Sequence, residues 1–337
     1  MEKHCLARME ACYSLACAQL GGRDVLLAAS ENRSGDAAAI DRETRQAYPV
    51  RGLAGGVMNI VPIPWEEDAF LAIQRFYPVF CSQEAEIVRF RLRRDDDGYR
   101  AETDVVQRLP FVHRIALCGS AAAPRLIAST LCGGKSAVDD WSRSGAVYAL
   151  FLDGECRRVE KMQSLAEGLH RNHGLYAPPG GSHEPLLFSA DEGVFALDTE
   201  TLRCRKLLDA PVSDVFPFDL DGDGTQELAA ITPFHGDTLE IFRQSGGAYV
   251  SCEAYPTAFG HAVWCGKIGA ESAVILCGRG GDRSTVLLRT DAGLRWTSAD
   301  VLDAGVGAAN IQVVSDGGRT VLYACNHAAG EIAEYTL

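Results

Sequence analysis

The chain has 337 residues and carries 32 Lys and Arg side chains against 45 Asp and Glu, which gives a formal charge of -13. This excess of acid disfavours nucleic acid as a partner, because its phosphates would be repelled. The first residues contain no apolar run long enough for a signal peptide or a membrane span, and the twelve cysteines form no Cys-x-x-Cys pair. We therefore expect a cytoplasmic protein with reduced cysteines, no membrane partner and a small-molecule or neutral ligand.

One pattern recurs along the chain. In each repeat a polar residue opens an apolar strand, and a turn and a second apolar strand follow it. The seven openings are Tyr13, Asn59, His113, His173, Asp214, His261 and Asn310. They are 41 to 60 residues apart, which suits four-stranded antiparallel blades. The sequence therefore predicts an all-β fold, a seven-bladed β-propeller.

The two ends of the chain are predicted to close the ring. Second strands are expected at residues 25–29, 69–73, 126–129, 186–189, 228–231, 273–276 and 320–324. After Asn310 there is room for only three strands, the last at residues 331–336. Residues 3–9 can supply the missing outer strand and so remove an exposed sheet edge. Because no Pro/Ser-rich linker divides the chain, residues 1–337 are expected to form a single domain.

Two insertions, at residues 74–83 and 131–145, explain the widest spacings, and long loops on a rigid scaffold often carry function. Candidate walls for a sugar ring are Tyr77, Phe80 and Trp141. Candidate ligands for a carboxylate or an enediolate are Arg75, Lys135 and Arg143. Further polar contacts are expected from Glu31, Asn32, Arg33 and Arg279.

Residues 216–231 combine two short apolar strands with an acidic loop. Asp219, Asp221 and Asp223 alternate along the loop, and Glu227 sits where a ninth-position carboxylate would complete an oxygen cage. With the carbonyl of Thr225, these groups form the all-oxygen ligand set that calcium prefers. The alternative is an Asp/Gly turn that binds no ion.

This loop resembles that of FG-GAP or VCBS repeats, β-propeller blades with an Asp-rich loop between their first two strands. The family's usual ninth residue is Asp, whereas this chain has Glu227. The resemblance implies Ca²⁺ at the loop and supports the propeller fold. The other six repeats have plain turns at this place.

Histidines are predicted to gather on one rim of the propeller. His113, His173 and His261 open innermost strands, His170 precedes one, and His235 and His327 follow second strands. His4 and His183 are expected elsewhere. A ring of imidazoles with Tyr13, Asn59, Asp214 and Asn310 can hold a divalent metal such as Mn²⁺, Zn²⁺ or Mg²⁺, with His113, His173 and His261 as first candidates, or supply a general base. The remaining alternative is a polar channel mouth that only holds water.

A second, weaker resemblance is to the aldos-2-ulose dehydratase group and to propeller polysaccharide lyases. It rests on residues 170–174 (His-Arg-Asn-His-Gly), 260–264 (Gly-His-Ala-Val-Trp) and 326–331 (Asn-His-Ala-Ala-Gly-Glu). These families imply proton abstraction next to a carbonyl or carboxylate of a sugar or sugar acid. The expected catalytic residues are His113, His173, His261 and His170, with Tyr77 or Tyr176 as acid. Further substrate contacts are expected from His235, His327, Asn59 and Asn310.

The sequence leaves other functional classes open. The rival to a carbon–oxygen lyase is a non-catalytic propeller that uses the same rim to bind a ligand or a protein, and a purely structural scaffold is a third alternative.

Overall fold

The computed structural model describes residues 1–179, 184–316 and 318–337, and in these residues β-strands are the only regular secondary structure. Strand burial is high in the second strand of each sheet and lowest in the outermost strand. Every residue of β7 (Ala69–Gln74) and β19 (Glu227–Thr232) is buried, whereas β17 (Arg203–Leu208) carries exposed basic side chains. Continuous apolar runs therefore mark the core strands and mixed sequences mark the outer ones. No helix that could span a membrane occurs in the described part of the chain.

Five sheets have four antiparallel strands each. One contains β10 (Val112–Ser120), β11 (Ala123–Thr130), β12 (Gly145–Leu152) and β13 (Val159–Leu169), and the next β14 (Gly174–Tyr176), β15 (Leu186–Ala190), β16 (Gly193–Asp198) and β17. The third contains β18 (Asp214–Phe218), β19, β20 (Thr238–Ser245) and β21 (Ala248–Pro256). The fourth contains β22 (Gly260–Ile268), β23 (Glu271–Gly278), β24 (Thr285–Thr290) and β25 (Trp296–Asp303). The fifth contains β26 (Ala308–Asp316), β27 (Arg319–Asn326), β28 (Glu331–Thr336) and β1 (Glu2–Arg8).

The remaining strands form one eight-stranded sheet. Its members are β2 (Cys12–Leu20), β3 (Arg23–Ser30), β4 (Ala37–Asp41), β5 (Ala47–Arg51), β6 (Asn59–Pro62), β7, β8 (Glu86–Arg94) and β9 (Tyr99–Arg108). Parallel pairing of β5 with β9 joins its two halves. The tip of the β8–β9 hairpin is held against β5, because Arg51 pairs with Asp97 at 2.7 Å and Tyr48 meets Tyr99 edge to face. Five four-stranded sheets are therefore separate, and this docked hairpin merges the other eight strands into one sheet, a contact that the sequence prediction did not include.

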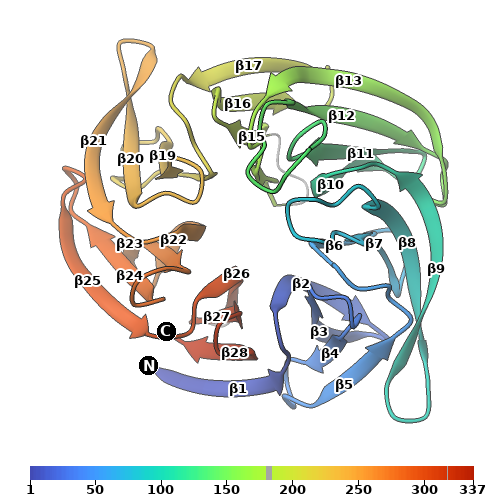
Figure 1. Cartoon of the computed structure of the whole chain (residues 1–337). Coiled ribbons are helices and arrows are strands. Elements are labelled where there is room, and N and C mark those ends of the chain that lie inside the picture. Colours follow the sequence, from blue (N-terminus) through green and yellow to red (C-terminus); the bar gives the residue numbers. More distant parts are fainter. Residues whose placement is uncertain (180–183, 317) are drawn as a thin grey trace.

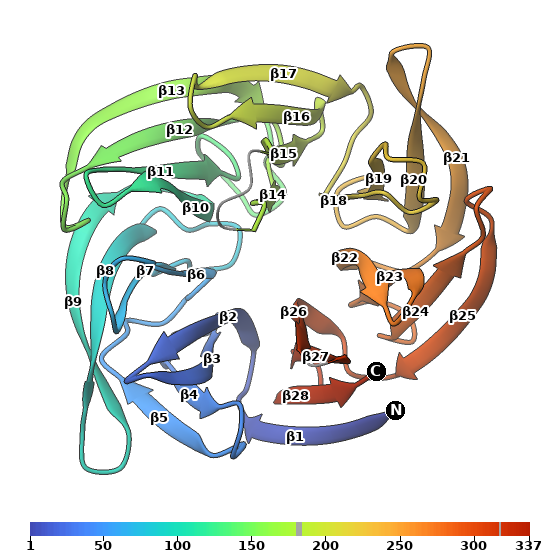
Figure 2. The same ribbon diagram turned by 180° about the vertical axis from the view of Figure 1, so that it is seen from behind.

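All sheets are arranged around a central axis, as in a β-propeller (Figures 1 and 2). The strands that line the axis are β2, β6, β10, β14, β18, β22 and β26, and each contacts the next around the ring. Each begins within two residues of an opening predicted from the sequence. The loops that lead into these strands and those that join second to third strands share one rim.

The ring closes where β1 pairs with β28 along its whole length, beside the C-terminus (Figure 1). The Nζ atom of Lys3 lies 2.7 Å from Asp303 Oδ2 on β25 and 2.6 Å from Glu331 Oε1 on β28. The buried hydroxyl of Tyr335 also donates to Asp303, at 2.8 Å. Burial alone would raise the pKa values of Asp303 and Glu331, but their hydrogen bonds with Lys3 outweigh it and lower both pKa values. One lysine thus joins the N-terminal strand to two neighbouring sheets.

We predict that Lys3→Met lowers the unfolding free energy at pH 7 by about 1–3 kcal/mol, because two partly buried carboxylates lose their cation. The folded-state pKa values of both carboxyls are depressed, so this stabilisation is present at neutral pH. It is lost as the pH falls below the unfolded-state values of about 4 and through the folded-state pKa values. Urea unfolding at pH 7 and at about pH 3 would measure it. Lys161→Met, on the outer strand β13, is the control and should change little. An equal loss at both pH values would contradict the account.

Candidate functional site

A shared backbone irregularity places side chains at the axis. The pairing of innermost with second strands skips one residue, so Tyr13, His113, His261 and Ala309 are each the extra residue of a β-bulge. A bulge leaves its extra residue unpaired and re-aims the side chain. Tyr13, His113 and His261 consequently line one central pocket, together with His173 at the start of β14.

Three predicted members of this ring lie one residue beyond the axial position. The Oδ1 atom of Asn59 accepts a hydrogen bond from the backbone of Ile115 at 2.9 Å, and the Nδ2 atom of Asn310 donates to the carbonyl of Tyr13 at 2.7 Å. Asn59 and Asn310 therefore link adjacent innermost strands, and neither of these predicted substrate contacts lines the central pocket. The third, Asp214, accepts from His173.

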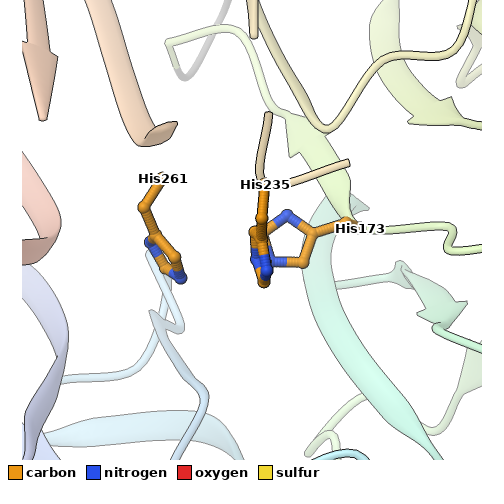
Figure 3. A group of neighbouring side chains, drawn as sticks. All are labelled: His173, His235 and His261. Atoms are coloured by element: carbon orange, nitrogen blue, oxygen red, sulfur yellow. The ribbon is translucent and has the colours of Figure 1, made fainter. Parts of the chain in front are cut away.

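Three histidines converge at the axis (Figure 3). One ring nitrogen from each of His173, His235 and His261 lies within 4.8 Å of the other two. The Nε2 atoms of His173 and His235 are 3.3 Å apart. His113 is beside them, with its ring centre 4.5 Å from that of His173. Of the three histidines predicted as metal ligands, His173 and His261 belong to this cluster, and its third member is His235 on the β19–β20 loop instead of His113.

Hydrogen bonds fix the orientation of two of the three rings. Nδ1 of His173 lies 2.7 Å from Oδ2 of Asp214, and Nδ1 of His261 donates to the carbonyl of Ala309 at 2.6 Å. These bonds leave both Nε2 atoms towards the pocket. Such outer partners are typical of histidines that ligate metals. The Nε2 atom of His261 accepts a hydrogen bond from Arg279 at 3.3 Å.

Burial keeps His113, His235 and His261 uncharged. His113, His173 and His261 are each at most 2% exposed. Desolvation, and then the neighbouring cations and imidazoles, lower the pKa of His235 to about 2 and lower those of His113 and His261 well below the usual value. Neutral imidazole is the form that binds a metal or accepts a proton.

The central pocket has a volume of about 260 Å³. Besides the four histidines, its lining residues are Tyr13, Glu31, Met58, Val79, Phe80, Phe259, Arg279 and Gly280. The predicted contacts Phe80 and Arg279 are in place. Met58 and Phe259 were missed, although each stands immediately before an innermost strand, as His173 does. The pocket thus combines apolar walls with a few converging polar groups, as small-molecule sites do.

The two insertions support the pocket from outside. Trp141 packs against Phe80 and Phe234, and Lys135 Nζ lies 3.1 Å from the centre of its indole ring. The other insertion residues are turned elsewhere. Arg75 pairs with Glu86 at 2.9 Å, Tyr77 stacks on Arg33, and Arg143 is exposed on its loop beside Gly134. Of the predicted binding residues in these loops, only Phe80 lines the pocket.

Other predicted residues lie apart from the axis. The Nδ1 atom of His170 is 2.7 Å from Glu192, and Tyr176 packs edge to face on Phe216. The Nε2 atom of His327 lies 2.6 Å from Glu31. His327 lines a neighbouring cavity and not the central pocket. His4 is on β1, as expected for a residue away from the rim, and His183 is outside the described residues.

The acidic loop is organised by its own backbone. Carboxylate oxygens of Asp219, Asp221 and Asp223 lie within 4.8 Å of one another and accept backbone hydrogen bonds, one of them from Thr225. Glu227 is fully buried, and within the described residues its Oε1 atom has no partner. Burial, followed by the three aspartates, raises the pKa of Glu227 to about 7.

No family model and no curated protein matches this sequence. Among solved structures, BBS1N, determined in complex with ARL6DN, has a TM-score of 0.60 at 13% identity over 100% of this chain and 95% of that one. Sqt1 of Saccharomyces cerevisiae has a TM-score of 0.56 at 9% identity, covering 95% and 83%. A 6-phosphogluconolactonase-like protein of Bacteroides uniformis has a TM-score of 0.53 at 10% identity, covering 90% and 91%. At these identities the likeness defines the class of fold alone, a β-propeller.

We predict that metal-free protein loses stability as the pH falls from 7.5 to 5.5. The unfolded chain gains a proton on each histidine near pH 6.5, whereas His113 in the folded state does not, so each such residue contributes a slope of up to about 1.4 kcal/mol per pH unit. His113→Gln should reduce the slope by about one proton in urea unfolding with EDTA. Phe76→Leu, which disturbs packing beside His113 without removing a titrating group, should retain it. An unchanged slope in His113→Gln would refute the assignment.

Proposed function

We propose that this β-propeller is a metal-assisted carbon–oxygen lyase that acts on a sugar derivative in its axial pocket. The observation that carries the proposal is the convergence of His173, His235 and His261, with Asp214 and Ala309 holding two of the rings. Three buried neutral imidazoles are expensive to assemble in an apolar pocket unless they bind something.

The donor set fits a transition metal better than magnesium. Imidazole nitrogens suit Zn²⁺ and Mn²⁺, whereas Mg²⁺ prefers oxygen ligands. Ligation by His261 requires its Nε2 to give up the hydrogen bond from Arg279, whose other terminal nitrogen is already 3.7 Å from Glu31. When bound, the metal would polarise a carbonyl or carboxylate oxygen of the substrate and acidify the neighbouring C–H.

In this proposal, residues beside the three histidine ligands accept and donate the protons. The hydroxyl oxygen of Tyr13 is 3.4 Å from Nε2 of His113 and 3.5 Å from Arg114 Nη2. If Nε2 of His113 carries the ring proton, its Nδ1, which has no partner among the described residues, can accept the proton from carbon. Tyr13, accepting from His113 and Arg114, can then give its own proton to the departing hydroxide, which leaves as water.

A sugar-sized substrate fits the walls of the pocket. Phe80, Met58 and Phe259 provide apolar surface for one face of a ring, and Arg279 and Glu31 provide polar contacts at its edge. The weak resemblance of the histidine segments to aldos-2-ulose dehydratases and propeller lyases points to the same chemistry. The substrate class we propose is a keto-sugar or a sugar acid.

Metal analysis tests the site. Protein purified without chelator should retain about one transition metal per chain after dialysis, and a His173→Ala/His235→Ala variant should lose it, because two of three imidazole ligands are gone. His170→Ala removes a rim histidine outside the cluster and should keep the metal. Equal metal contents in the wild type and the double variant would contradict metal binding by these histidines.

A turnover assay distinguishes the proposed enzyme from the alternative of a non-catalytic binding protein. Metal-loaded protein incubated with keto-sugars and uronides should produce an unsaturated product. The product would be detected by its ultraviolet absorbance and by a mass lower than that of the substrate by one water molecule. Tyr13→Phe should lower kcat by about 10²–10⁴-fold with metal retained, as expected when a general acid is removed. If metal and ligand bind but no substrate in the panel is converted, the non-catalytic alternative is favoured.

We also propose calcium at the Asp219–Glu227 loop, as the FG-GAP resemblance implies. The unpartnered Oε1 atom of Glu227 and the three clustered aspartates support it, since a cation would relieve both the desolvation and the mutual repulsion. In addition, we propose that the eight-stranded sheet counts as two blades, which gives seven around the axis. The seven innermost strands support this count.

Calcium should stabilise the protein by about 2.7 kcal/mol at a concentration 100 times its Kd. Thermal unfolding with calcium and with EDTA would measure this as a higher Tm in calcium. Asp221→Asn should abolish most of the shift, because it removes a charged ligand, whereas Asp96→Asn in the β8–β9 turn should preserve it. No difference between calcium and EDTA in the wild type would refute the site.

A further inference from the structure

A second cavity of about 680 Å³ adjoins the axial pocket on the same rim. It lies where the β1–β2, β23–β24 and β27–β28 loops meet. We call it the arginine notch, and its lining residues are Arg8, Met9, Glu10, Ala11, Arg279, Arg283, Gly307, His327, Ala328, Ala329 and Gly330. Arg279 lines both the notch and the axial pocket.

The charges of the notch oppose those of the molecule. Three guanidinium groups line it against the one carboxylate of Glu10, in a chain with a formal charge of -13. Arg8 reaches Glu331 at 3.3 Å, and Arg279 is 3.7 Å from Glu31. The exposed side chain of Arg283 has no hydrogen bond or ion pair with any described residue. Positive charge gathered at one place on an acidic protein attracts anions to that place.

The loop that carries two of these arginines is held rigidly. The backbone nitrogens of Arg279 and Gly280 donate to the carbonyls of Phe259 and Ala258, and that of Arg283 donates to the carbonyl of Gly280, each at 2.9 Å. A β-carbon on Gly280 would lie only 3.1 Å from Ala258 and Phe259. The turn therefore fixes the backbone from which both arginines extend, with Arg279 beside His261 and Arg283 on the notch.

We infer that the arginine notch binds the anionic end of the substrate, a phosphate or carboxylate group, while the sugar carbon to be deprotonated lies at the histidines. Planar guanidinium forks match both oxyanions, and Arg279 is the shared wall that would touch both parts of one molecule. The inference rests on the proposed function for the axial pocket, but anion binding itself needs neither the metal nor turnover. It specifies an anionic rather than a neutral sugar as ligand.

Calorimetric titration of metal-free protein with glucose 6-phosphate, glucuronate and glucose tests the inference. At least one anionic probe should bind, and neutral glucose should bind at least tenfold more weakly. Arg283→Gln should weaken the anionic probe about tenfold or more, as for loss of a charge-assisted hydrogen bond. Arg283→Lys should restore part of the affinity, and Arg243→Gln, which removes the same charge from an exposed site on β20, should leave it intact.

The two anionic probes distinguish the sources of the group. Tighter binding of glucose 6-phosphate assigns the notch to phosphate, and tighter binding of glucuronate assigns it to carboxylate. If glucose binds as well as both anions, if neither anion binds, or if Arg283→Gln is without effect, the inference is wrong even when the axial metal is present. Loss of the metal site with anion binding preserved would instead refute only the proposed chemistry.

Discussion

The desolvation of four imidazole rings at one point of the axis is the constraint on which the site depends. Burial lowers the pKa of His113, His235 and His261, so these three rings stay neutral and do not repel one another. Buried polar groups without partners are costly. The molecule offsets part of this cost with Asp214, the carbonyl of Ala309 and Tyr13, and it leaves the His173 and His235 Nε2 atoms facing each other.

The propeller supplies the geometry that makes this convergence possible. Each innermost strand starts at the same rim, and in β2, β10 and β22 a β-bulge near the start of the strand directs one side chain to the axis. The next residue along ties its strand to the neighbour, as Asn59 and Asn310 do. One residue therefore builds the pocket and the following residue holds the ring together. Lys3 completes the same ring from outside by joining β1 to β25 and β28.

Much of this arrangement was accessible from the sequence. The period of polar openings located the innermost strands, because the turn and strand pattern is local, and the C-terminal strand at residues 331–336 was placed at its observed bounds. A bulge in β26 shifts the register by one residue without a sequence signal, so Asn310 was assigned to the axis although Ala309 is the extra residue there. Asn59 was assigned to the pocket, but Met58, which precedes β6, lines it. His235 entered the histidine cluster through the path of its loop, and β5 joined β9 through a distant hairpin tip. No local sequence pattern predicts either contact.

The central claim is that His173, His235 and His261 bind one transition metal at the axis. A crystal structure with anomalous diffraction data collected on both sides of the absorption edge of the retained metal tests it most directly. The account predicts a single edge-dependent peak at about 2.0–2.2 Å from one nitrogen of each of the three rings. A metal peak located elsewhere, or an axial pocket without one in protein that retains metal, would contradict it.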